Sequence, residues 1–110
     1  MKLSEIIQET GLTIQTPPSE DYEIHSGYAC DLLSEVMGRA KPGSIWITVQ
    51  SHSNIVAVAS ITGIRAVVLV NARTYSEDTI AKAKEEGIAL LRSNIDSFTL
   101  SGKIYAMLQG

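Results

Sequence analysis

Cysteine, aromatic residues and long apolar runs are all scarce in this sequence of 110 residues. The single cysteine, Cys30, excludes an internal disulfide and a zinc site built from several cysteines. No apolar stretch approaches the roughly 20 residues that span a bilayer, and the first residues lack the pattern of a secretory signal. We therefore expect a protein of the cytoplasm that has no membrane partner.

Clustered positive charge is also missing. Nine Lys and Arg residues stand against twelve Asp and Glu, which gives a net charge of −3, and the basic residues are scattered singly along the chain. Surfaces that bind nucleic acid are normally rich in clustered Lys and Arg. The sequence thus argues against DNA or RNA as a partner.

Two common nucleotide-binding motifs are lacking as well. There is no glycine-rich turn ending in Gly-Lys-Ser/Thr, which excludes a kinase or ATPase of the P-loop type. No strand ends in Gly-x-Gly-x-x-Gly, which disfavours a dinucleotide cofactor. The two histidines, His25 and His52, are not accompanied by carboxylates at metal-ligand spacing, so we expect neither a metal nor a cofactor.

What is present is the composition of a single globular domain covering residues 1–110. Hydrophobic residues make up 45% of the chain and charged residues 19%. Apolar periodicity, helix-capping residues and turn residues divide it into alternating helices and strands. Helices are expected from Leu3 up to Gly11 and over residues 31–40, 55–61, 76–86 and 96–108, and strands over residues 12–16, 23–29, 44–50, 65–70 and 88–91.

The apolar segment of residues 55–61 is ambiguous, because such a run suits either a buried strand or a helix that is apolar on every side. We assign it as a helix, since Ser53 or Asn54 could cap it and its small residues permit close packing. The resulting alternation of strand and helix predicts an α/β fold, with a mainly parallel sheet covered by helices on both faces.

Polar loops follow three of the predicted strands, where parallel sheets commonly bind ligands. If these strands are neighbours, the loops would converge on a small anion such as a phosphate or carboxylate. The candidate ligand-binding residues are Gln50, His52, Ser53, Asn54, Asn71 and Arg73. The structural alternative is that Ser53 and Asn54 cap a helix and that Arg73 is merely solvated.

Three segments resemble a known family. Residues 21–28 (DYEIHSGY), 30–37 (CDLLSEVM) and 46–59 (WITVQSHSNIVAVA) are similar to stand-alone DRTGG domains, and the similarity extends nearly end to end. Such domains also occur inside phosphotransacetylases and CBS-containing pyrophosphatases, and in relatives of the amino-terminal domain of HPr kinase. Asp21 and Gly27 occupy matching motif positions, whereas Tyr22 stands where the motif prefers Arg and Ser26 replaces the first of its paired glycines.

The resemblance implies a three-layer α/β/α sandwich like the HPr kinase N-terminal domain, with a mostly parallel sheet that is mixed at its edge. It also implies a regulatory or dimer-forming role beside a catalytic partner, and the sensing of a small ligand such as an adenine nucleotide. The kinase label that some free-standing members carry does not suit this chain, which has no P-loop.

Our first functional hypothesis is a non-catalytic regulatory domain, a homodimer that acts beside a metabolic enzyme. The helix over residues 55–61, or the adjoining sheet edge, would supply part of a self-complementary interface. The alternative is a small-ligand sensor that binds an adenine nucleotide or another phosphate-bearing anion at the C-terminal ends of the parallel strands. An enzyme with His52 as general base is a weaker third hypothesis, because no nucleophile or paired acid accompanies it.

Overall fold

The computed structural model describes all residues, 1–110, and contains one five-stranded sheet. The helices are α1 (Leu3–Thr10), α2 (Leu33–Arg39), α3 (Asn54–Thr62), α4 (Glu77–Glu86) and α5 (Ser97–Gln109); the strands are β1 (Thr13–Thr16), β2 (Ser26–Ala29), β3 (Ser44–Thr48), β4 (Ala66–Leu69) and β5 (Ala89–Arg92). All ten predicted elements are present with shifted ends. The longest shift is in β2, which begins three residues later than expected.

The strands lie in the order β1-β5-β4-β3-β2, and only the β1–β5 pair is antiparallel. The two central strands, β3 and β4, are buried at every position. Their mostly apolar sequences, rich in β-branched residues, suit strands that are covered on both faces. The predicted sheet, mostly parallel and mixed at one edge, is therefore confirmed.

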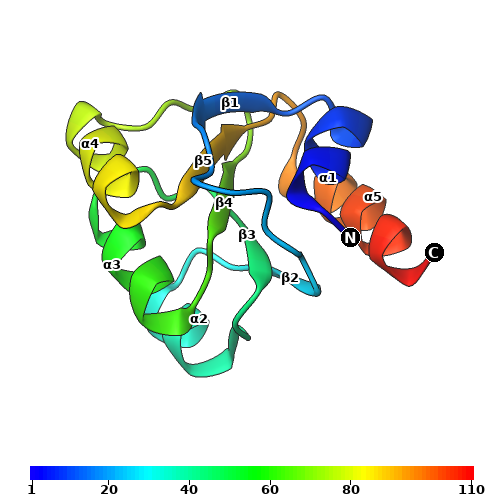
Figure 1. The fold of residues 1–110 in the computed structure, drawn as a ribbon, viewed down its shortest axis with the longest axis horizontal. Helices are drawn as coiled ribbons and strands as arrows, with labels where there is room; N and C mark the ends of the chain where they lie inside the picture. The colour runs from blue at the N-terminus through cyan, green and yellow to red at the C-terminus, as the bar shows by residue number, and fades with distance from the viewer.

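Helices cover both faces of the sheet (Figure 1). On one face α1 and α5 contribute Leu3, Ile6, Leu100 and Ile104 to an apolar cluster with alternate strand residues. On the other face α2, α3 and α4 pack around Trp46, whose side chain is fully buried. The predicted three-layer α/β/α sandwich is confirmed.

The ambiguous segment of residues 55–61 lies within α3 and is helical, as predicted. Ile55, Val56, Val58 and Ala59 are buried because α3 packs against the sheet and between α2 and α4. The only large apolar side chain that α3 exposes is Ile61. Burial in this layer thus accounts for most of the apolar character of α3.

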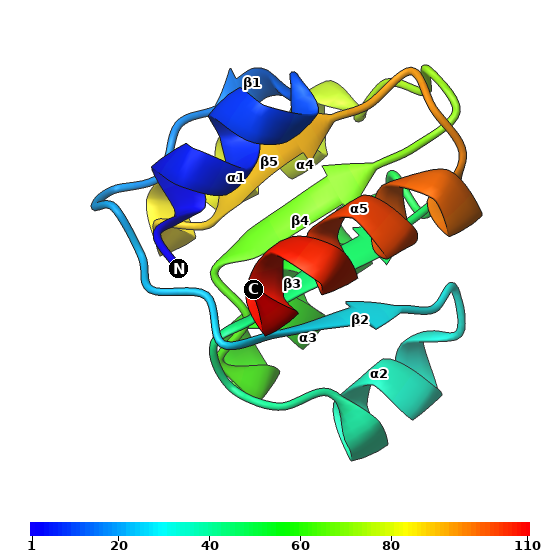
Figure 2. The same cartoon turned by 90° about the vertical axis from the view of Figure 1, so that its right-hand side faces the viewer.

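On the face with α1 and α5, the two helices share the sheet between them (Figure 2). The α1 helix lies beside the β1–β5 end of the sheet, while α5 packs against the edge strand β2 and against β3. Burial along β2 alternates, with Gly27 and Ala29 exposed. These two residues of β2 are therefore open to solvent beside α5.

Predicted helix ends are borne out at several places. The side chains of Ser76 and Asp96 cap α4 and α5 by accepting from the backbone N–H groups of Thr79 and Thr99, and Gly11 and Gly87 end α1 and α4 in the left-handed conformation. None of the helices is both long enough and apolar enough to cross a membrane.

Candidate functional site

The loops that follow β3, β4 and β5 meet at one rim of the sheet, which we call the C-terminal rim. Because these strands are parallel neighbours, their carboxyl ends share one edge. Backbone bonds connect successive strand ends, from Val70 N–H to the Thr48 carbonyl (3.1 Å) and from Ser93 N–H to the Leu69 carbonyl (2.9 Å). The structure thus places the three predicted loops side by side.

The loop after β4 has an unusual backbone. Asn71 and Ala72 both adopt the left-handed conformation, with φ of 61° and 56°. Their N–H groups donate to the carbonyls of Ile95 and Ser93, which ties this loop to the one before α5. A left-handed alanine is strained, and strain of this kind is often found at functional sites. Since the two N–H groups already have partners, a ligand would meet exposed side chains of this loop such as those of Asn71 and Arg73.

A second arginine, Arg92, joins Arg73 at the C-terminal rim. Arg92 ends β5, and its Nε donates to the Arg73 carbonyl oxygen at 3.0 Å. Neither arginine forms an ion pair with a carboxylate, because the four ion pairs of the structure all involve other residues. Sequence reasoning missed Arg92, because it is the last residue of a strand and not part of a polar loop.

The loop between β3 and α3 is held by a different set of bonds. Gln50 donates from Nε2 to the Asp31 carbonyl at 2.8 Å, so its side chain is a structural link between two loops. His52 and Asn54 are exposed at the rim. Ser53 occupies the cap position of α3, but its side chain makes no capping hydrogen bond, and Asn54 is already inside the helix. The prediction that one of these two side chains caps α3 is therefore not met.

Asp31 connects β2 to the C-terminal rim. The sequence predicts that it caps the helix over residues 31–40, but α2 begins at Leu33 with Leu32 in the cap position. The Asp31 carboxylate instead accepts from Thr48 Oγ1 (2.8 Å) and from the Val49 N–H (2.9 Å) at the end of β3. The capping prediction was wrong because these long-range donors hold the carboxylate.

Asp21, which matches the family motif, forms its hydrogen bonds at the start of α1 and not with the loops of the C-terminal rim. Its two carboxylate oxygens accept from the Ser4 hydroxyl (2.6 Å) and the Ser4 N–H (2.9 Å). These two bonds lower the pKa of Asp21 below its ordinary value. The Asp21 carboxylate thus caps the first turn of α1 through Ser4. The neighbouring Tyr22, which replaces the motif arginine, donates to the Gly87 carbonyl at 2.8 Å and links this segment to the end of α4.

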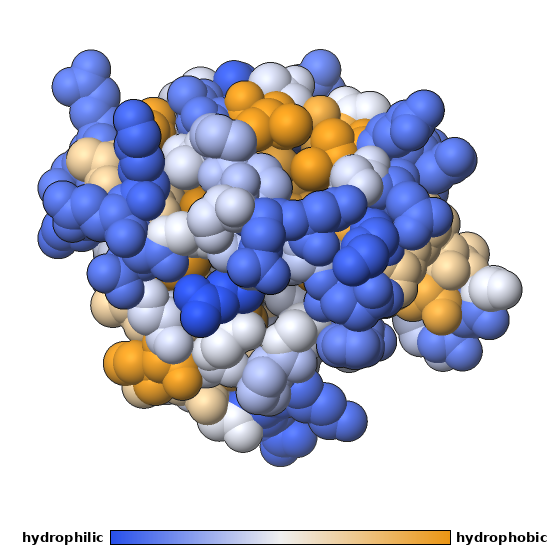
Figure 3. Space-filling view, in the orientation of Figure 1, coloured by the Kyte–Doolittle hydropathy of each residue, from blue (hydrophilic) through white to orange (hydrophobic).

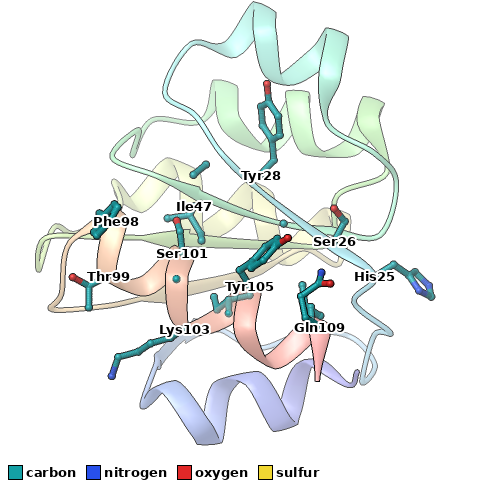
Figure 4. A pocket seen from close by; sticks show the side chains of 15 residues that line it. His25, Ser26, Tyr28, Ile47, Phe98, Thr99, Ser101, Lys103, Tyr105 and Gln109 are labelled. Atoms are coloured by element: carbon teal, nitrogen blue, oxygen red, sulfur yellow. The ribbon is translucent and has the colours of Figure 1, made fainter.

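A pocket of about 780 Å³ lies between β2 and α5, and we call it the β2–α5 pocket (Figure 4). The α5 helix faces β2 across it. Gly27, Ala29 and Ile47 line its strand side, while Phe98, Ser101, Tyr105 and Leu108 line its helix side. Of the residues predicted from the sequence, only Gly27 lies here. The pocket was missed because it is formed between an edge strand and a helix that are distant in the sequence, and not by a polar loop.

The motif position of Gly27 implies a backbone role that only glycine can fill, and the structure does not show one. Its φ lies outside the left-handed region, and a Cβ atom added to it would lie 3.5 Å from Ile45 Cγ2, an ordinary contact. A side chain is therefore sterically allowed at this position, and the glycine leaves space in the pocket.

Two carboxylates with lowered pKa values, Asp21 and Asp96, lie at the starts of helices. The Thr99 N–H lowers the pKa of Asp96 in the same way that Ser4 lowers the pKa of Asp21. His52 is exposed, and its side chain makes no hydrogen bond to a carboxylate or a nucleophile. No group of three or more His, Cys, Asp or Glu side chains is placed to hold a metal ion.

The fold is similar to that of a solved structure that contains a DRTGG domain. It is similar to the crystal structure of the CBS and DRTGG domains of the regulatory region of Clostridium perfringens pyrophosphatase in complex with its activator, diadenosine tetraphosphate. The TM-score is 0.71 at 18% sequence identity, over 91% of this chain. The chain spans 44% of the length of that protein chain. No protein-family model and no curated protein sequence matches this chain. The likeness confirms the DRTGG-like fold that the resemblance implied.

Proposed function

We propose that this chain is a non-catalytic regulatory domain that senses a small phosphate-bearing ligand at its C-terminal rim. The observation that carries the proposal is that two arginines without carboxylate partners, Arg73 and Arg92, meet at this rim, where the Arg92 side chain donates to the Arg73 backbone carbonyl. Guanidinium groups are the preferred protein partners of phosphate, because their N–H donors match its oxygens. His52, Asn54 and Asn71 would add polar contacts from the adjacent loops.

A role without catalysis agrees with the chemistry of the rim. General acid–base work requires a group with a suitable pKa and a hydrogen-bonded partner in a site that excludes water. His52, the best candidate for a base, is exposed and has no such partner. The rim therefore suits recognition of an anion better than its chemical conversion.

The comparison with a known regulatory region supports the sensing role and gives a first candidate ligand. The pyrophosphatase region of similar fold binds diadenosine tetraphosphate, an adenine nucleotide, as its activator. We propose by analogy that this chain responds to an adenine nucleotide or another phosphate-bearing anion, and that it acts beside a metabolic enzyme.

The arginine pair provides the direct test. We expect Arg73→Ala and Arg92→Ala each to weaken binding of diadenosine tetraphosphate and of inorganic tripolyphosphate by about 10-fold, since each removes charge-assisted hydrogen bonds. Isothermal titration calorimetry measures this directly. Arg65→Ala is the matched control, because Arg65 precedes β4 at the opposite end of the sheet and loses the same charge. Equal losses in all three variants, or no binding by the unmodified protein, would refute the rim as the anion site.

We also propose that the chain forms a homodimer, and that the edge of β2 contributes to it. The β2 strand has one neighbour, β3, and leaves its other side free for pairing. Exposed apolar side chains elsewhere are dispersed, with Ile14 on β1 and Ile61 on α3, and most of the face in Figure 3 is hydrophilic. Light scattering after size-exclusion chromatography should give twice the chain mass, and a monomer at micromolar concentration excludes the dimer.

A further inference from the structure

The strand side of the β2–α5 pocket includes two residues with little or no side chain, Gly27 and Ala29, beside larger residues such as Ile47. Gly27 and Ala29 project toward this pocket from β2, and neither fills it. Glycine inside a strand weakens the strand, and such a glycine often marks a close approach of another molecule. Because a side chain would be tolerated at Gly27, the fold itself does not require this loss of stability.

Aromatic side chains form much of the opposite wall. Tyr105 and Phe98 are 66% and 90% exposed, which is unusual for large rings on the solvent side of a small domain. In Figure 4 the Tyr105 side chain lies between α5 and β2, while the Lys103 side chain extends away from the strand. A flat ring could therefore lie between the peptide surface of β2 and the aromatic wall.

Ser101 places an unpaired hydroxyl group in the same pocket. Its hydroxyl oxygen is buried and has no hydrogen-bond partner, although the residue lines the pocket. Leaving a buried hydroxyl unpaired costs stability, and such groups are few in native proteins. A hydrogen-bonding group at the edge of a bound ring would satisfy it.

We propose that the β2–α5 pocket binds a flat heteroaromatic ring that carries a hydrogen-bonding group on its edge, such as a nucleobase. The volume of about 780 Å³ lies within the range of small-molecule sites, and the wall combines apolar side chains with polar ones such as Ser26, Thr99 and Gln109. This site uses none of the rim residues Arg73, Arg92 and His52, so it is independent of the anion site proposed above. Ring recognition and phosphate recognition are separate properties of the two sites.

A stabilising variant at Gly27 tests the pocket. Gly27→Val fills the strand side with a residue favoured in strands, so its Tm should rise by a few degrees while nucleoside binding falls at least 10-fold. The probes are adenosine, guanosine, cytidine, uridine and riboflavin, which carry no phosphate, measured by saturation-transfer NMR and calorimetry. Thr13→Val on the opposite edge strand β1 is the control for added strand propensity and should not change binding.

Ser101→Ala is a second variant for which stability and affinity should change in opposite directions. Removing the unpaired hydroxyl should raise the Tm of the free protein slightly, while the affinity for the bound nucleoside should fall about 5- to 10-fold. The variants Arg73→Ala and Arg92→Ala should leave nucleoside binding unchanged. The proposal is overturned if none of the five compounds binds at millimolar concentration, or if one binds equally well to Gly27→Val and Ser101→Ala. If the unmodified protein binds a nucleoside but not tripolyphosphate, only the anion site proposed at the C-terminal rim is refuted.

Discussion

Replacing Trp46 with alanine should destabilise the protein by about 3–5 kcal/mol, a large share of the stability of a domain of this size. The Trp46 side chain is fully buried at the centre of the cluster beneath α2, α3 and α4. Its indole N–H also donates to the Cys30 carbonyl at 2.8 Å, immediately before Asp31. The substitution therefore leaves a cavity and releases the segment that Asp31 fastens to β3.

Urea unfolding followed by circular dichroism measures this loss, because the variant has no tryptophan fluorescence. Trp46→Phe is the matched variant, since it keeps an aromatic ring in the core but removes the N–H donor. We expect it to cost about 1–2 kcal/mol. A loss below about 1 kcal/mol for Trp46→Ala would contradict the packing described for this face.

The second large effect concerns Tyr75 and alkaline pH. The Tyr75 side chain is buried, and its hydroxyl donates to the Leu91 carbonyl at 2.7 Å, with the Val67 carbonyl at 3.2 Å. Burial raises the pKa of Tyr75 far above its ordinary value of about 10. The folded state therefore keeps this phenol neutral at a pH where the unfolded chain ionises it.

The sign of the pH effect follows from this difference. Below about pH 10 both states hold the proton, so the contribution of Tyr75 to stability is fully present. Above that pH, Tyr75 alone should lower the free energy of unfolding by about 1.4 kcal/mol per pH unit, until the pH reaches its folded-state pKa. Over pH 10 to 12 the loss amounts to about 2.3 kcal/mol, because the unfolded phenol is only half ionised at pH 10.

Tyr75→Phe isolates this contribution from the other tyrosines and the lysines. At neutral pH the variant should be about 1–2 kcal/mol less stable, because a buried carbonyl loses its donor. Its stability should then fall less steeply than that of the unmodified protein above pH 10. Parallel stability curves for the two proteins between pH 8 and 12, from urea unfolding at each pH, would contradict the burial of this hydroxyl.

Local signals predicted most of this fold correctly. Strand β4 is an unbroken apolar run and is buried at every position, as a central parallel strand should be. The Ser76 cap and the Gly87 ending of α4 depend on residues close in sequence, and both are observed. Parallel strand order then brings the loops after β3, β4 and β5 to one rim without further information.

Features that depend on distant contacts were not predictable. Asp31 has the sequence position of a helix cap, yet its carboxylate binds donors 17 and 18 residues away, at the end of β3. Arg92 reaches the rim only because β5 pairs with β4. The β2–α5 pocket requires a strand and a helix separated by most of the chain, and its signal in the sequence is a single glycine, Gly27.

The central claim is that a phosphate-bearing ligand binds at the C-terminal rim beside Arg73 and Arg92. A titration of the ¹⁵N-labelled protein with tripolyphosphate, followed by two-dimensional NMR, tests it most directly. We predict chemical-shift changes at the backbone amides of residues 71–74 and 92–94, with little change in β2. Saturable shifts confined to other parts of the chain, or no shifts at millimolar tripolyphosphate, would contradict it.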